Sequence, residues 1–143
     1  SQQVITTGIV QPDVARVVTV TGNQAGAAEA IVIAGTDIAG NAITETITAS
    51  GTTTVAGTKA FAHVASITVP AQTQAGDTIS VGTNKSVGLP HRLAYATLVL
   101  LKLLNGSADG GTVTANASEV AKNVYAVSGT LNGTNAVDLY YLV

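Results

Sequence analysis

The feature that most limits the possible folds is a recurring pattern of short segments in which apolar and polar residues alternate. These segments end at Gly, Asn or Asp. In residues 15–21, for example, Val18 and Val20 fall on one face, and Gly22 and Asn23 follow directly. Alternation with a period of two indicates β-strands, and the residues that interrupt it favour turns. The chain is also rich in β-branched residues, with 21 Thr and 19 Val among 143 residues, and such residues suit a pleated surface.

The same pattern recurs along the whole chain. We expect strands in residues 15–21, 28–34, 42–49, 52–55, 61–69, 78–82, 95–104, 112–115, 123–128 and 137–143. Residues 95–104 are almost continuously hydrophobic, which is typical of a strand buried on both faces, although a buried helix would look similar. The remaining helical alternative is one turn at residues 118–122. Glu45 is out of place on an apolar strand face and indicates an edge or a paired position.

About ten short strands without crossover helices favour an all-β fold over any α/β arrangement. We therefore predict a single-domain, antiparallel β-sandwich, Greek-key or jelly-roll-like, over residues 13–143. Residues 1–12 contain four apolar residues and end at Pro12. They fit either an extended N-terminal arm that orders on a partner or an ordinary first strand, and both interpretations stay open.

Charge is sparse, and this excludes several classes of partner. Only 14 residues are charged and the formal net charge is −2. Because nucleic-acid binding needs clustered Lys and Arg, the six scattered basic residues argue against it. The longest apolar stretch is too short for a membrane helix, so we expect no membrane partner. Without cysteine there is no disulfide or thiolate site, and without a basic, cleavable leader we expect synthesis in a reducing cytoplasm.

Residues capable of catalysis or metal binding are few and dispersed. His63 lies in a strand pattern and His91 in a loop after a proline, where an ordinary hydrogen bond is the simplest role. The eight acidic residues are spread singly. Asp37, Asp77 and Asp109 lie near glycines, where Asx-turns are expected. No nucleophile-elbow, phosphate-loop, dinucleotide or zinc motif is present. We predict a protein that is not an enzyme, with no catalytic, cofactor-binding or metal-ligating residues.

Several blocks of the sequence resemble small virion proteins of tailed bacteriophages, of the capsid decoration or cement type. The matching blocks are IAGTDIAGNAITETI (33–47), VAGTKAF (55–61), SITVPA (66–71), GDTISVG (76–82), GLP (88–90), LNGT (131–134) and VDLYY (137–141). The resemblance implies a head-associated structural protein that binds the major capsid protein. It brings no catalytic residue with it.

The resulting expectation is a protein of the virion surface, made in the bacterial host cytoplasm, that self-associates as a dimer or trimer on the capsid. Both ends of the chain suit partner contacts, because each holds apolar residues. The candidate contacts are Val4, Ile5, Ile9, Val10, Tyr140 and Tyr141. Two alternatives remain: another phage component, such as a tail tube, head fibre or baseplate protein, and a carbohydrate-binding or adhesive module.

Overall fold

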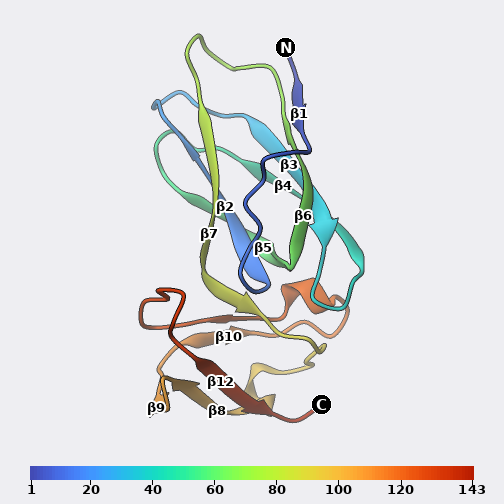
Figure 1. Cartoon of the computed structure of the whole chain (residues 1–143), viewed down its shortest axis with the longest axis vertical. Coiled ribbons are helices and arrows are strands. Elements are labelled where there is room, and N and C mark those ends of the chain that lie inside the picture. The colour runs from blue at the N-terminus through green and yellow to red at the C-terminus, as the bar shows by residue number, and fades with distance from the viewer.

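The computed structural model describes residues 1–143, and its strands form three antiparallel sheets (Figure 1). In spatial order, the first sheet contains β1 (Gln3–Ile5), β6 (His63–Val69), β3 (Ala30–Thr36) and β4 (Ala42–Thr48). The second contains β10 (Thr112–Thr114), β11 (Val124–Ala126), β7 (Ile79–Gly88), β2 (Arg16–Gly22) and β5 (Val55–Phe61). The third contains β12 (Val137–Tyr141), β8 (Val99–Leu104) and β9 (Ser107–Ala108). Two single 3-10 turns, η1 (Ala96–Leu98) and η2 (Val120–Lys122), complete the elements.

The first two sheets are connected by nested strand pairs. Strands β3 and β4 pair in the first sheet, β2 and β5 pair in the second, and β1 and β6 pair again in the first. Nested antiparallel pairing that alternates between two sheets is the arrangement of a jelly roll. The next position, beside the end of β7, is filled by β11 from much later in the chain. The predicted antiparallel, jelly-roll-like sandwich is therefore confirmed.

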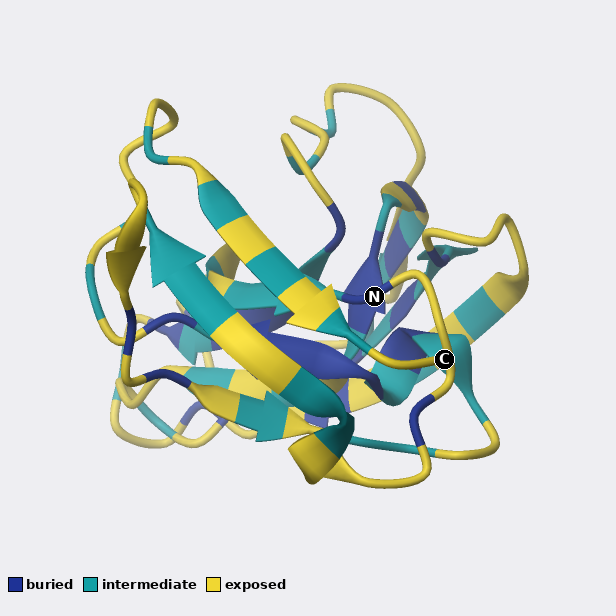
Figure 2. Ribbon diagram, turned by 90° about the horizontal axis from the view of Figure 1, so that it is seen from below, coloured by how far each residue is buried: buried dark blue, intermediate teal, exposed yellow.

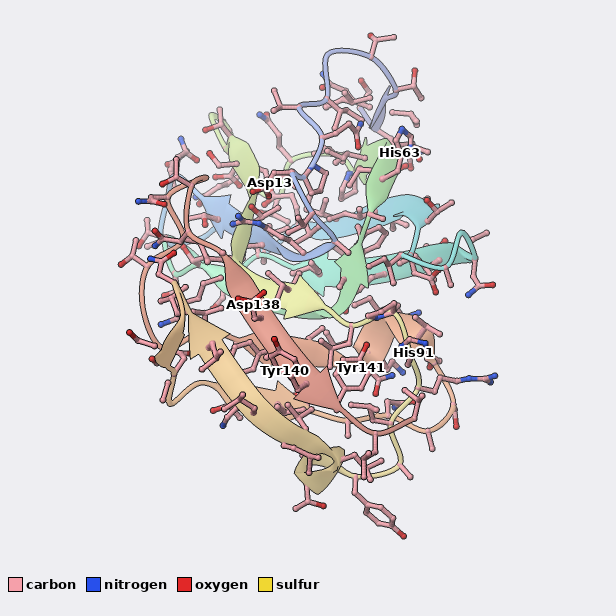
Figure 3. All side chains as sticks on the ribbon, turned by 60° about the horizontal axis from the view of Figure 1, so that its bottom comes forward. Asp13, His63, His91, Asp138, Tyr140 and Tyr141 are labelled. Atoms are coloured by element: carbon pink, nitrogen blue, oxygen red, sulfur yellow. The ribbon has the colours of Figure 1, made fainter.

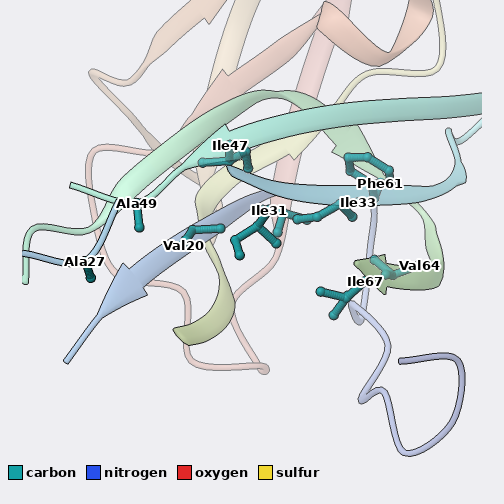
Figure 4. Packing of buried hydrophobic residues seen from close by; sticks show 10 residues of the cluster. Val20, Ala27, Ile31, Ile33, Ile47, Ala49, Phe61, Val64 and Ile67 are labelled. Atoms are coloured by element: carbon teal, nitrogen blue, oxygen red, sulfur yellow. The ribbon is translucent and has the colours of Figure 1, made fainter. Parts of the chain in front are cut away.

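The main core lies between these two sheets (Figure 4). Val20 of β2 and Phe61 of β5 come from the second sheet, while Ile31 and Ile33 of β3 come from the first, and all four are fully enclosed. Burying one such side chain contributes about 1.5–3 kcal/mol. The alternation of Val18 and Val20 with Thr residues thus does what the sequence pattern predicts: it directs one face of β2 into the sandwich.

Glu45 is a confirmed edge residue, and it explains one incorrect strand boundary. It lies on β4, at the edge of the first sheet, and its carboxylate accepts hydrogen bonds from the Thr58 N–H (2.6 Å), the Thr58 hydroxyl (2.9 Å) and the Lys59 N–H (3.2 Å) of β5. We expected strands at residues 52–55 and 61–69, with Gly57 as a boundary. Gly57 instead lies inside β5, where the absence of a side chain leaves room for the Glu45 carboxylate.

Residues 95–104 differ most from their expected structure. Residues 96–98 form η1, and only Val99–Leu104 is a strand. That strand is not buried on both faces: none of its residues is fully buried, and Leu100 and Leu101 are exposed. The expected turn at residues 118–122 is present as η2. No helix in the structure has the length and apolar character needed to cross a membrane.

Candidate interaction surface

The third sheet packs one of its faces onto the end of the jelly roll. Val137, Leu139 and Tyr141 of β12 point inward, as do Val99 and Leu104 of β8. They lie against a small second core made of Leu89, Leu93, Tyr125 and Val127, all nearly or completely buried. The β-strand period of two therefore places the alternate residues of β12 and β8 on the opposite, outward face.

That outward face is uncovered and mostly apolar. Tyr140 of β12 pairs directly with Leu101 of β8, and their side chains are 59% and 43% exposed. A β-bulge next to this pair leaves Leu100 unpaired and 66% exposed. Seen from below, both strands are banded in teal and yellow without any buried segment (Figure 2). Figure 3 shows Tyr140 and Asp138 along β12, where Asp138 is the one charged residue.

Exposed apolar residues continue from β12 to the C-terminal residues. Leu142 and Val143 are 57% and 86% exposed, and the Leu142 N–H donates to the Leu98 carbonyl (3.0 Å), which holds this end of the chain beside β8. We define the outer face of the third sheet as Leu100, Leu101, Tyr140, Leu142 and Val143. Large contiguous apolar surfaces are uncommon on monomeric proteins and mark sites of association.

A buried polar network fixes the second core beneath the third sheet. The Asp109 carboxylate accepts hydrogen bonds from the hydroxyls of Ser128 and Tyr125, from the Ser128 N–H (3.0 Å) and from the Gly111 N–H (3.2 Å). These bonds, that of Ser128 first, hold the pKa of Asp109 well below its ordinary value. Burial and the Asp109 hydrogen bond raise the pKa of Tyr125 to about 12. Lys102 extends inward from β8, and its ammonium donates to the Gly111 carbonyl (2.9 Å). The network holds β8 and the 109–111 loop in one geometry.

The N-terminal candidate contacts lie elsewhere. Val4 and Ile5 belong to β1, an edge strand on β6, and are 58% and 39% exposed. Val10 is 93% exposed, whereas Ile9 packs against the main core. The Gln11 side chain exchanges two hydrogen bonds with the Val64 backbone (2.8 and 3.0 Å), which fixes this segment to β6. Because β1 and β12 lie at opposite ends of the molecule (Figure 1), the structure does not bring the two sets of candidate contacts together.

A cleft of about 420 Å³ separates β12 from the jelly roll. One wall carries Leu139 and Tyr141, and the other carries the ion pair of Asp13 and Arg16, whose closest atoms lie 2.7 Å apart. His91 is held by the Tyr141 hydroxyl (2.9 Å; Figure 3), so its predicted role as a loop hydrogen-bonding residue is confirmed. Nowhere in the chain do three or more His, Cys, Asp or Glu side chains gather around one point.

Sequence reasoning missed Tyr95, Leu100 and Leu101, which are exposed large apolar residues. The signal was present, since hydrophobic residues run without interruption from Leu98 to Leu101. We interpreted that run as a strand buried within the chain itself, and periodicity does not distinguish this from a strand with one uncovered face. In comparisons with protein-family models, curated proteins and solved structures, nothing matches this chain.

Proposed function

We propose that this protein is a non-enzymatic virion structural protein, a decoration or cement protein of a tailed-phage head. In this proposal it binds the outer surface of the assembled head and stabilises contacts between subunits of the major capsid protein. It is made in the bacterial cytoplasm and functions on the virion. The observation that carries the proposal is the uncovered outer face of the third sheet, together with the sequence resemblance described above.

The physical argument starts from the sequence of β8. A run such as Val99–Leu104 is typical of a strand covered on both faces, yet here only the inner face is covered. A partner that packs on Leu101 and Tyr140 would supply the missing layer. Each large side chain that becomes fully buried there contributes about 1.5–3 kcal/mol to association, although the loss of freedom on binding offsets much of the total.

A capsid lattice is a suitable partner for a surface of this kind. It offers the same binding site many times, so a module that binds only the assembled lattice stabilises it by linkage. Self-association as a dimer or trimer on the capsid would add avidity to modest individual contacts. The chain has few charges with which to attract or repel the lattice, so apolar packing rather than electrostatic attraction determines the fit in this proposal.

The direct test is to mix purified protein with emptied, undecorated heads and to image the particles. We expect density at regular lattice positions and no binding to free capsid subunits. The variants Leu101→Asp and Tyr140→Asp should weaken binding by at least about tenfold, because each places a charge in a desolvated contact. Ile38→Asp is the matched control: Ile38 is also 43% exposed but lies in the turn between β3 and β4, so binding should persist.

A second pair of variants tests the N-terminal candidates separately. Val4→Asp and Val10→Asp change exposed residues of the other candidate surface. If they abolish binding while Leu101→Asp does not, the N-terminal segment is the docking site and the third sheet is not. Wild-type protein that fails to bind heads but assembles into rings or tubes would favour a tail component, and specific signals on a glycan array would favour an adhesive module.

A further inference from the structure

Two acidic side chains are buried together at the end of the jelly roll opposite the third sheet. Glu29 directly precedes β3 and is 2% exposed, while Asp77 lies two residues before β7 and is 4% exposed. Neither carboxylate forms an ion pair, because the ion pairs of the protein involve only Asp13 and Glu119. Burying ionised carboxylates without a compensating cation is costly.

Hydrogen bonds within the protein satisfy only part of this pair. The Thr73 hydroxyl lies 2.9 Å from Glu29 Oε1 and 3.0 Å from Asp77 Oδ2. A hydroxyl has one proton and can donate to only one of the two oxygens at a time. The other oxygen of Glu29, Oε2, is shielded from solvent and has no hydrogen-bond partner at all. The Thr73 N–H also donates to Glu29 Oε1 (2.8 Å), and the Gln74 backbone and side-chain N–H groups donate to Asp77 (3.1 and 2.9 Å), so Oε2 is the one carboxylate oxygen of the pair without a donor.

The oxygens that converge there come from four separate residues. Besides the two carboxylates and the Thr73 hydroxyl, the Gly26 carbonyl lies 3.4 Å from the same hydroxyl oxygen. Both acidic residues also line a cavity of about 440 Å³, whose wall includes Gln3 and Gln72. Carboxylate, carbonyl and hydroxyl oxygens at the edge of a cavity that can hold water are the ligands that Ca²⁺ takes, with six to eight oxygens in a flexible geometry.

From the unpartnered Oε2 of Glu29 and the oxygens that meet at the Thr73 hydroxyl, we infer that Glu29, Asp77 and Thr73 form a calcium site. The ion ties the residue 72–77 loop to the start of β3, two segments that otherwise meet mainly through Thr73. With only two carboxylates the affinity is modest, with a dissociation constant of about 10⁻⁴ M. Mg²⁺ binds more weakly, because it keeps its water shell and demands a regular octahedron.

The test uses the full chain after removal of metals with a chelator. Isothermal titration with CaCl₂ should show one site per chain, and saturating Ca²⁺ should raise the thermal unfolding midpoint by at least about 5 °C. Glu29→Gln and Asp77→Asn should abolish both effects. Asp138→Asn, which changes an exposed carboxylate on the third sheet, is the matched control and should keep them.

A cation site is distinguished from a purely structural role by comparing the stability of wild type and Glu29→Gln in chelator and in Ca²⁺. In chelator, Glu29→Gln should be at least as stable as wild type, because the change removes repulsion between two buried carboxylates. In Ca²⁺ the order should reverse. The inference is overturned if wild-type protein shows neither binding heat nor a midpoint shift with Ca²⁺, or if Glu29→Gln responds as wild type does. The wild-type response alone decides the matter if a variant fails to fold.

Discussion

Asn123 is the residue on which the turn region beneath the third sheet depends. It is completely buried. Its amide donates to the backbone carbonyls of Asn116 and Glu119 (both 2.8 Å), and its side-chain oxygen accepts from the N–H groups of Asn116 (2.7 Å) and Leu93 (3.0 Å). One side chain thus satisfies backbone groups from two loops that lie far apart in the sequence, which a buried polar residue must do to be tolerated.

Replacing Asn123 by Ala should lower the free energy of unfolding by about 4 kcal/mol, because buried backbone donors and acceptors lose their partners and a cavity remains. Urea denaturation measures the change. Asn132→Ala is the control, since Asn132 makes similar side-chain bonds to Thr134 and Asn135 but at an exposed position. Its loss should stay below about 1 kcal/mol. Equal losses would contradict the importance of burial.

Asp109 makes stability depend on pH in the acid range. Its pKa in the folded protein lies below the ordinary value of 3.8, chiefly because of the hydrogen bonds from Ser128 and Tyr125. The folded state therefore holds this proton less tightly than the unfolded state does. The stabilisation is complete above pH 3.8 and is lost as the pH falls from there towards the lower, folded-state pKa.

We therefore expect the thermal unfolding midpoint of wild type to fall steeply below about pH 4, and the midpoint of Asp109→Asn to fall less steeply. At neutral pH the variant should be the less stable protein. Calorimetry across the acid range supplies the comparison. Parallel curves for the two proteins would show that other carboxylates cause the acid sensitivity.

Among the elements, β4 and β5 show how the sandwich closes along one edge. They belong to different sheets, so no backbone ladder joins them, and the Glu45 carboxylate bridges them through Thr58 and Lys59. The approach is possible because Gly57 has no side chain to occupy the same space. Charge-assisted hydrogen bonds of this kind are stronger than neutral ones.

Gly57→Ala should cost about 2 kcal/mol of unfolding free energy, because the new methyl group displaces the carboxylate. The cost should shrink in a Glu45→Ala background, where of these close contacts only that with the Ile47 Cδ1 atom (2.9 Å) remains, and this non-additivity is the specific signature. Gly110→Ala is the matched control, since an added Cβ there meets no neighbour, and we expect a change within about 0.5 kcal/mol. Additive effects at residues 45 and 57 would contradict the proposed collision.

Strand positions were predicted best from the sequence where apolar and polar residues alternate strictly. In β2, Val18 and Val20 alternate with Thr19, and the strand forms within one residue of its expected start and end. Prediction failed where tertiary contacts matter: Gly57 is typical of a turn, but it lies inside β5 and leaves room for the Glu45 carboxylate. Asp77 was expected to form an Asx-turn with the residues after it, yet it accepts from Thr73 and Gln74 before it. The pairing of Asp77 with Glu29 joins two loops, which no local pattern reveals.

In the molecule as a whole, the proposed docking surface lies at the opposite end from the proposed calcium site. Five of the exposed large apolar residues form the outer face of the third sheet, whereas the buried pair Glu29 and Asp77 lies at the other end of the jelly roll. The formal net charge is only −2. Such a molecule gains little from long-range electrostatic steering, which needs clustered charge of one sign.

If the outer face of the third sheet docks on a phage head, the affinity should therefore be nearly independent of salt. We expect the dissociation constant to change by less than about threefold between about 50 mM and about 500 mM NaCl. Binding to immobilised heads, measured across that range, provides the test, and Lys85→Ala, which removes an exposed positive charge, should leave affinity unchanged. A steep loss of affinity with salt would point to charged contacts instead.

Strand β11 comes late in the sequence, and this affects how the chain folds during its synthesis. The first seven strands lie within residues 1–88, but the neighbour of the β7 terminus comes only with Val124–Ala126. Until then the cluster around Leu89 and Leu93 is incomplete, because its two other buried members are Tyr125 and Val127. A nascent or truncated chain that stops before residue 124 therefore exposes apolar side chains of this cluster and the unpaired end of β7. Both features favour aggregation. Synthesis of the C-terminal third therefore removes this tendency to aggregate.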